Sequence, residues 1–214
     1  MNQNTQDFWE TCWQRDTDRD YGKYLKAFYQ KQDPMIDLFK RHHVRHVCDA
    51  ACGYGAYSLM LASNGFQVEG FDISQTSVEL TKKLLGKYGI DTSNYKAASV
   101  LDTGYAAIFD AVVAVSVLDH LYAADARAAL TELLRIVKPG GLVVVSFDNL
   151  DEDDLKRQHI LAADGSILYT DPSWGGMIFH PYADGELADW LSQYRIIHHY
   201  QNSRNERFYV IEKV

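Results

Sequence analysis

The chain has 214 residues, of which 47% are hydrophobic and 23% charged, and it carries a net charge of -8. This composition is that of an ordinary globular protein long enough to bury a substantial core. The acidic charge disfavours a nucleic-acid partner, and the lack of an apolar run near about 18 residues disfavours a membrane-spanning segment.

Cysteine usage and the first residues indicate the compartment. Cys12, Cys48 and Cys52 are too few and too odd in number for a disulfide framework. We expect Cys48 and Cys52 to be small buried residues rather than a metal or redox pair. The first residues lack the basic and apolar regions of a signal peptide. A cytoplasmic protein is therefore expected, as a monomer or homodimer.

The first 42 residues are expected to form helices. Aromatic and aliphatic residues recur at helical spacing over residues 7–32, which predicts one or two amphipathic helices. Asp33 followed by Pro34 is a favourable helix start, so a further helix is expected over residues 35–42. Two interpretations remain open for the first aromatic residues, a set of core-facing helices or a flap over a ligand: Phe8, Trp9, Trp13 and Tyr21.

Residues 43–148 alternate between strand and helix patterns. Residues 109–116 are nearly continuously apolar, which is typical of a strand buried on both faces of a parallel sheet. The expected strands are residues 44–50, 68–71, 95–100, 109–116 and 142–147, and the expected helices are residues 57–62, 74–88 and 125–137. This alternation predicts an α/β fold with βαβ units and helices on both faces of the sheet.

The last third of the chain has a different pattern. An aromatic and glycine-rich segment precedes a helical pattern at residues 184–193. Residues 195–200 and 208–213 alternate polar and apolar side chains around a polar turn, which predicts an antiparallel hairpin. Because no long linker is present, we expect one domain over residues 1–214. Its expected parts are a helical cap (1–42), a cofactor-binding core (43–148), a substrate-side insertion or lid (149–194) and a closing hairpin (195–214).

Residues 47–74 form the most informative motif. They are arranged as strand, glycine turn, helix, strand and acid, with Gly53 and Gly55 in the turn and Asp72 at the end of the second strand. Glycines allow the backbone to approach a ligand and leave amide groups at the helix start free to donate. An acid about 20 residues further on is placed to bind ribose hydroxyls. The pattern predicts a nucleotide-type cofactor.

Charge indicates which cofactor. Asp49 precedes the turn, residues 47–74 contain no Lys or Arg, and Ser58 stands where a dinucleotide motif has its third glycine. A pyrophosphate is unfavourable there, whereas the ammonium and sulfonium of S-adenosylmethionine fit. Residues 47–55 resemble the first motif of class I S-adenosylmethionine-dependent methyltransferases. The family usually has glycine at the position of Ala51, so the turn is expected to be tighter here.

The resemblance implies a fold and a cofactor site. The fold is a Rossmann-like, doubly wound, mostly parallel seven-stranded sheet with an antiparallel C-terminal hairpin. Asp72 is expected to bind the ribose, although it could instead cap the next helix, a role that Ser74 can fill alone. Ser99 and Val100 are expected to face the adenine, with Asp102 as a rival. The full expected cofactor set is Asp49, Ala51, Gly53, Gly55, Asp72, Ile73, Ser99, Val100, Ala114 and Val115.

The implied reaction is methyl transfer to an oxygen or nitrogen of a small molecule, leaving S-adenosylhomocysteine. His120 follows the fourth strand and could act as a base near neutral pH, although it could equally pack against the next helix. Asp148 is a second candidate. Two other functions remain open: a non-catalytic protein that binds S-adenosylmethionine as a signal, and a nicotinamide-dependent oxidoreductase.

The acceptor pocket is expected under residues 169–182, where glycines could act as hinges of a lid. The alternative is a packed hairpin that covers the sheet edge. The expected pocket residues are Tyr21, Tyr122, Trp174, His180 and Tyr182. The eight histidines show no ligand spacing with carboxylates, so no metal site is expected.

Overall fold

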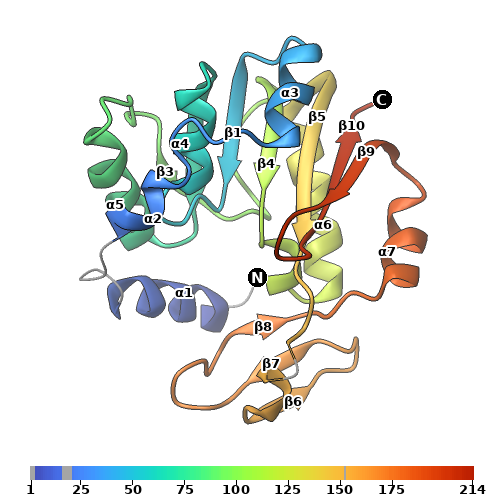
Figure 1. The fold of residues 1–214 in the computed structure, drawn as a ribbon. Coiled ribbons are helices and arrows are strands. Elements are labelled where there is room, and N and C mark those ends of the chain that lie inside the picture. The colour runs from blue at the N-terminus through green and yellow to red at the C-terminus, as the bar shows by residue number, and fades with distance from the viewer. Residues whose placement is uncertain (1–2, 16–20, 152) are drawn as a thin grey trace.

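The computed structural model describes residues 3–15, 21–151 and 153–214. Its main sheet has seven strands in the order β3-β2-β1-β4-β5-β10-β9 (Figure 1). Only β10 runs antiparallel, to both β5 and β9. The strands are β1 (His46–Ala50), β2 (Gln67–Asp72), β3 (Lys96–Ala97), β4 (Phe109–Ala114), β5 (Val137–Phe147), β9 (Arg195–Gln201) and β10 (Arg207–Glu212). The predicted sheet and its closing hairpin are confirmed.

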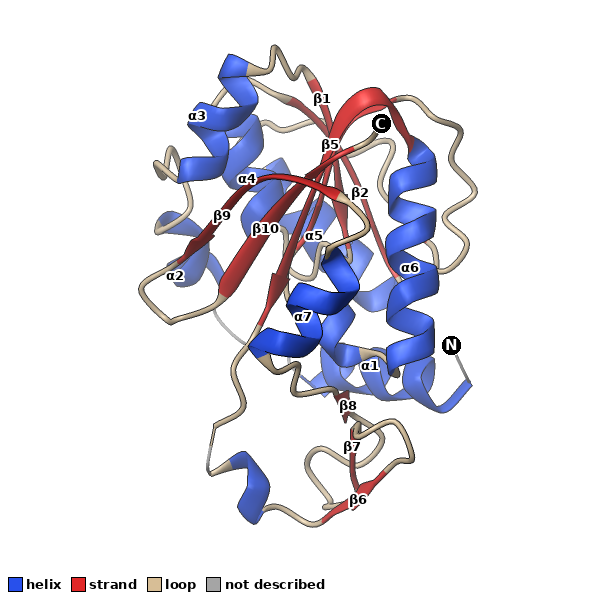
Figure 2. Cartoon of the chain, turned by 90° about the vertical axis from the view of Figure 1, so that its right-hand side faces the viewer, coloured by secondary structure: helices blue, strands red, loops and turns tan. Residues whose placement is uncertain are grey.

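Helices cover both faces of this sheet (Figure 2). Val47 and Val113 belong to one buried cluster, and their neighbours Cys48 and Val112 belong to another on the opposite face. This alternation is the period of two that a strand imposes, with apolar residues required on both faces. One face packs against α3 (Pro34–Arg41), α4 (Ala56–Ser63) and α5 (Gln75–Gly86), and the other packs against α6 (Ala123–Ile136) and α7 (Asp184–Leu191).

Helix starts follow the predicted signals. The Asp33 side chain accepts a hydrogen bond from the Met35 amide (3.1 Å), and Pro34 is the first residue of α3. The Ser74 hydroxyl accepts one from the Ser77 amide (3.1 Å) and caps α5. Ser74 therefore caps this helix with its own side chain, which leaves the Asp72 carboxylate available for another role.

The third strand is shorter than predicted. Only Lys96–Ala97 pair with β2, although residues 95–100 were expected to be a strand. The Asp102 amide donates to the Ser99 carbonyl (3.1 Å), and this turn bends the chain away from the sheet.

Two helices and a small sheet lie around the carboxyl ends of the strands. Figure 1 shows α1 (Gln3–Arg15) passing across these ends, with α2 (Tyr21–Lys26) beside α4. A three-stranded antiparallel sheet lies beyond α1, formed by β6 (His159–Leu161), β7 (Ile167–Tyr169) and β8 (Ile178–Phe179). Of the one or two helices predicted over residues 7–32, the structure shows two, and residues 16–20 lie outside the described part. None of the described helices has the length and apolarity needed to cross a bilayer.

Candidate functional site

A cavity of about 630 Å³ opens at the carboxyl ends of β1, β2 and β4. This is the edge at which open parallel sheets bind ligands. Its lining comes from the β1–α4 turn, the end of β2, the segment after β4, helices α1 and α2, and the β9–β10 turn. The sequence predicts the first three of these segments as cofactor-binding.

The turn after β1 has a left-handed backbone at three positions. The φ angles of Ala51, Gly53 and Gly55 are +56°, +55° and +85°. Glycine adopts this conformation freely, but a side chain at Ala51 costs about 1 kcal/mol or more. The Gly53 carbonyl is held by the hydroxyls of Ser77 (2.7 Å) and Thr81 (2.5 Å), both on α5. The tight turn predicted at Ala51 is therefore present, and α5 fixes it.

Asp72 is buried at the end of β2 and lines the cavity. Its carboxylate accepts hydrogen bonds from the amides of Gly53 and Ser74, both at 3.0 Å. Burial raises its pKa, and these amides oppose the rise. Two fixed donors leave lone pairs on the same carboxylate free for ligand hydroxyls.

Asp49 is the second acid of the cavity. Its carboxylate is buried and accepts a 2.5 Å hydrogen bond from the Ser58 hydroxyl. Burial raises the pKa of Asp49 to about 7, against this hydrogen bond. A cation in the cavity would relieve the desolvated charge. In the sequence, Ser58 stands out only because it replaces the third glycine of a dinucleotide motif. In the structure, it is the hydrogen-bond partner of Asp49.

The expected adenine contacts are placed only in part. Ile73, Ala98 and Val100 line the cavity, whereas Ser99 is not among the lining residues. The Ser99 hydroxyl instead accepts a hydrogen bond from the Leu101 amide (3.1 Å). The turn that ends β3 early rotates Ser99 away and brings Ala98 to the wall; Asp102 is exposed outside it.

Beyond β4 the chain makes a second left-handed turn. Ala114 is buried behind the wall, while Val115 and Ser116 line the cavity. Ser116 has a φ of +54°, and its amide donates to the Ser146 hydroxyl on β5 (2.9 Å). The sequence gives no indication of this strained residue, because serine is not a typical marker of a left-handed turn.

His120 lines the cavity from the one-turn helix η1 (Leu118–His120). Its Nδ1 donates to the Ile178 carbonyl (3.1 Å), so Nε2 carries the lone pair of the neutral ring. The ring packs edge-on against Trp9 at 5.3 Å between centroids. This ring contact of His120 is thus with α1, whereas the prediction was packing against the next helix, and its role as a base stays a prediction. Asp148 is not among the lining residues.

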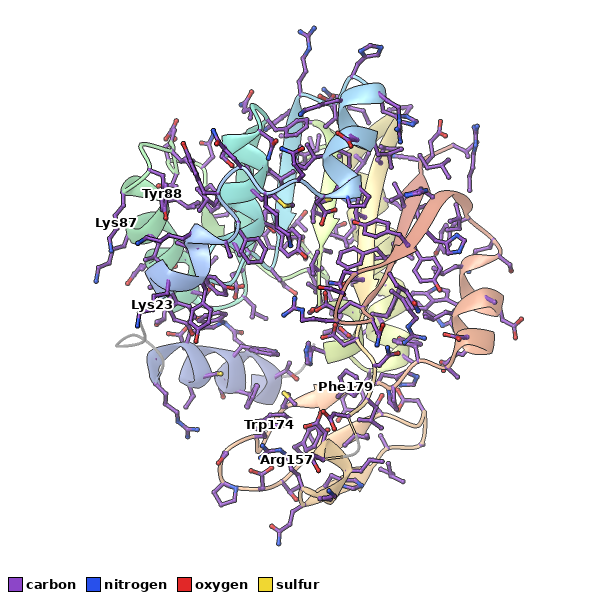
Figure 3. All side chains as sticks on the ribbon, viewed as in Figure 1. Lys23, Lys87, Tyr88, Arg157, Trp174 and Phe179 are labelled. Carbon is purple, nitrogen blue, oxygen red and sulfur yellow. The ribbon has the colours of Figure 1, made fainter. Side chains whose placement is uncertain are left out.

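None of the five predicted pocket residues lines this cavity, and four of them lie elsewhere in the fold. Tyr122 lines a separate cavity of about 270 Å³. His180 is buried between the Ser166 hydroxyl (2.9 Å) and the Glu186 carboxylate (3.0 Å). Tyr182 packs between Phe147 and Trp190, at 5.1 and 5.3 Å between centroids. Trp174 lies in the turn between β7 and β8, and its ring centroid is 3.8 Å from the Arg157 guanidinium; Figure 3 shows the two residues side by side. The insertion is thus a packed sheet that holds these side chains by its own contacts, although the Tyr182 hydroxyl is buried without a hydrogen-bond partner among the described residues.

This small sheet supports α1 rather than covering the cavity. Phe8 packs against its core of Ile167, Tyr169, Met177 and Phe179, and lies against Gly176. At the other end of α1, Trp13 approaches Gly53 of the glycine turn. Trp9 and Trp13 both line the cavity, so the flap interpretation of these aromatic residues matches the geometry. Tyr21 is buried behind the wall and stacks on Tyr54, which does line it (4.7 Å between centroids).

Glu10 fastens α1 to the start of α5. Its carboxylate accepts hydrogen bonds from the Ser74 hydroxyl (2.6 Å), the Thr76 amide (3.3 Å) and the Thr76 hydroxyl. Although burial opposes it, these bonds hold the pKa of Glu10 below its ordinary value. The helix that covers the cavity is therefore fixed to the same helix that holds the glycine turn.

Several lining residues lie outside the predicted set, from α2, the segment after α2, α4 and the β9–β10 turn. They are Lys23, Tyr24, Phe28, Lys31, Tyr57 and Arg204. Helical spacing predicts that Tyr24 and Phe28 share a face, but it does not say which face meets a ligand. Arg204 lies in a polar turn that reaches the cavity only because β9 and β10 pair beside β5. In the described ranges, no group of three or more His, Cys, Asp or Glu side chains is arranged to hold a metal ion.

A methyltransferase-domain family model matches residues 48–145, from β1 to β5. The chain is 25% identical over 137 residues to the ubiquinone biosynthesis O-methyltransferase of Rickettsia akari (strain Hartford), a match that covers 62% of this chain and 53% of that protein. The chain thus spans about half the length of this relative.

Two solved structures share the fold. A protein from Pyrococcus horikoshii OT3 superposes with a TM-score of 0.71 at 19% identity, over 93% of this chain and 94% of that one. The Burkholderia thailandensis 1,6-didemethyltoxoflavin-N1-methyltransferase, solved with that compound and S-adenosylhomocysteine, gives a TM-score of 0.70 at 16% identity, over 97% and 88%. The matched domain, the shared sheet order and the acidic glycine turn agree. The chain therefore contains a methyltransferase domain over residues 48–145 and has the fold of these solved structures.

Proposed function

We propose that the protein binds S-adenosylmethionine at the acidic end of its cavity and transfers the methyl group to an oxygen or nitrogen of a small molecule. The observation that carries this proposal is the pair of buried carboxylates, Asp49 and Asp72, on either side of a glycine turn that lacks a basic residue. That environment suits a cofactor with cationic groups and ribose hydroxyls, and it repels a pyrophosphate.

The residues that would hold the cofactor follow from their positions. Asp72 would accept the ribose hydroxyls, Ile73, Ala98 and Val100 would enclose the adenine, and Asp49 would face the cationic part. When bound, S-adenosylmethionine supplies a methyl group that an acceptor can displace in line. The protein then has to orient the acceptor, exclude water and take up a proton.

Proton transfer is proposed for His120. Its Nδ1 hydrogen is fixed on the Ile178 carbonyl, so Nε2 is the nitrogen able to accept the proton of a hydroxyl or amine. Trp9 and Trp13 on α1 cover the cavity next to it and limit the access of water.

Cavity size and charge favour a small acceptor. A volume of about 630 Å³ must hold both cofactor and acceptor, which leaves room for a compact organic molecule. The relatives act on both oxygen and nitrogen, judged by the names O-methyltransferase and N1-methyltransferase. Because the chain carries a net charge of -8, we propose that its acceptor is a metabolite rather than a nucleic acid. We also propose that the protein is cytoplasmic and is a monomer or a homodimer.

The predicted division of the chain is kept as a proposal with one change of role. Within residues 1–42, helices α1 and α2 would form the cap over the cavity, while α3 packs on the sheet; residues 43–148 would form the cofactor-binding core and 195–214 the closing hairpin. Residues 149–194 would support the cap through Phe8 instead of acting as a lid over the acceptor.

Calorimetric titration with S-adenosylmethionine, S-adenosylhomocysteine and NAD tests the binding step. Binding of the two adenosyl compounds and not of NAD is expected, and the reverse would support the oxidoreductase. Formation of S-adenosylhomocysteine with metabolite fractions then separates an enzyme from a non-catalytic binding protein.

A further inference from the structure

Charged residues of both signs line the cavity, and they come from different elements. The acids Asp49 and Asp72 come from β1 and β2, whereas the cations Lys23, Lys31 and Arg204 come from the α2 segment and the β9–β10 turn. Lys23 is labelled on α2 in Figure 3. The end of the cavity formed by α2, the residues after it and the β9–β10 turn is called the basic end below.

Tyr57 connects the basic residues into one wall. Its ring meets Phe28 edge-on at 5.6 Å between centroids, and the Lys31 ammonium lies 4.8 Å from the centroid of Phe28. Burial, and then the charges of Glu206 and Asp33, raise the pKa of Tyr57, and the charge of Arg204 lowers it, so this hydroxyl lies within electrostatic range of the guanidinium and of these acids. Phe28 and Tyr57 thus lie near two cations, Lys31 and Arg204.

The backbone holds Lys31 in this position. The carbonyl of Lys31 accepts a hydrogen bond from the Asn64 side chain (3.3 Å), and the Gln30 amide donates to the Ser63 hydroxyl (2.9 Å). Both partners lie at the end of α4. The ammonium therefore extends from a fixed point beside Phe28 rather than from a free loop.

Arg204 is placed by the turn between β9 and β10. The Asn202 side chain accepts hydrogen bonds from the amides of Arg204 (2.8 Å) and Glu206 (3.1 Å). The guanidinium pairs with Glu206 (3.1 Å) and is 69% exposed. Burial, and then the charge of Asp148, raise the pKa of Glu206, and the charge of Arg204 opposes the rise.

We propose that the methyl acceptor is a flat organic anion, such as an aromatic carboxylate, with its ring against Phe28 and Tyr57 and its anionic group facing Lys31 and Arg204. The inference rests on the proposed function, because it assigns the acidic end to the cofactor and the basic end to the acceptor. A guanidinium binds a carboxylate through two parallel hydrogen bonds, and aromatic walls favour a flat ring. A cationic acceptor would be repelled.

The test uses protein saturated with S-adenosylhomocysteine, so that binding is measured without turnover. Hydroxybenzoates, aminobenzoates, indole acetate and quinoline carboxylates are titrated by calorimetry, each beside its neutral amide. At least one carboxylate is expected to bind about tenfold or more tightly than its amide, the size of one charged hydrogen bond. Arg204→Gln and Lys31→Gln should each remove most of that difference. Lys87→Gln, an exposed residue at the end of α5, is the matched control and should change nothing.

Three results overturn the inference. Equal binding of acid and amide, or binding of neither by the loaded protein, removes the preference for an anion. A loss of affinity for S-adenosylhomocysteine in Arg204→Gln, with the acid-to-amide ratio unchanged, would mean that the basic end holds the carboxylate of the cofactor. If S-adenosylhomocysteine does not bind to the unaltered protein, the proposed function itself fails, which is a separate result.

Discussion

The raised pKa of the Asp49 carboxyl predicts that the affinity for the cofactor changes with pH near neutrality. Its pKa is raised to about 7 by burial, so only a small fraction of the free protein carries the charge at pH 5.5. If the bound cofactor requires the ionised form, affinity follows the ionised fraction of the free protein. From pH 5.5 to 7.5 that fraction grows, and the affinity for S-adenosylmethionine should rise by roughly 25-fold.

The same shift has a cost for folding. The folded-state pKa lies above the unfolded value of 3.8, so the protein is most stable with respect to this group below that value and loses stability as pH rises toward about 7. A difference of about three units corresponds to about 4 kcal/mol above pH 7. Asp49→Asn keeps an acceptor for Ser58 and removes the charge. In free protein at pH 8 it should therefore raise the free energy of unfolding, while weakening cofactor binding.

Calorimetry at both pH values, in two buffers of different ionisation enthalpy, measures affinity and proton release together. Asp72 also has a pKa raised by burial, so the decisive comparison is between the unaltered protein and Asp49→Asn. Asp102→Asn, an exposed acid outside the cavity, is the control. An affinity that does not change with pH, or an equal change in Asp49→Asn, would refute the reasoning.

Four further substitutions test individual parts of the site. Asp72→Ala should weaken S-adenosylmethionine binding by about 1.5–3 kcal/mol, and unchanged affinity by calorimetry would contradict the ribose assignment. Ala51→Gly should relieve the left-handed backbone and raise stability in urea by up to about 1 kcal/mol; a loss of that size would show that the turn is not strained. Glu10→Gln should make α1 more sensitive to proteolysis and weaken cofactor binding, with little change in the unfolding midpoint of the core. His120→Asn should lower kcat about 100-fold or more with cofactor affinity unchanged, and an unaltered kcat would remove its role as base.

The sequence predicts the parts of the fold that local patterns determine. The run at residues 109–116 identifies a doubly buried strand because a parallel sheet needs apolar residues on both faces. Asp33 and Ser74 identify helix starts because their side chains satisfy free amides. Asp49 and Asp72 were placed correctly at the cavity, since the strand–turn–helix pattern fixes where both strands end.

Contacts between segments that are distant in the chain could not be predicted from the sequence. His180 and Tyr182 lie in an aromatic stretch that would suit a pocket. Ser166 and Glu186 instead bind the His180 ring, and Trp190 packs against the Tyr182 ring inside the fold. Arg204 reaches the cavity only through the pairing of β10 with β5, which no local pattern specifies. The prediction of Ser99 failed for a smaller reason, a turn that shortens β3 by a few residues.

The residues whose backbone conformation or buried charge lowers the stability of this chain lie at one edge of the sheet. Ala51 and Ser116 have left-handed backbones directly after β1 and β4, and Asp49 carries a desolvated carboxyl beside them. Each lowers stability, so a sequence selected for folding alone would place glycine or a neutral residue there. A bound cation would offset the cost at Asp49 and none of the cost at the two backbone positions. The backbone strain must therefore serve geometry, by bringing main-chain groups close to a ligand, while the buried acid serves charge. Asp49→Asn and Ala51→Gly separate these two contributions, because only the first should alter how binding depends on pH.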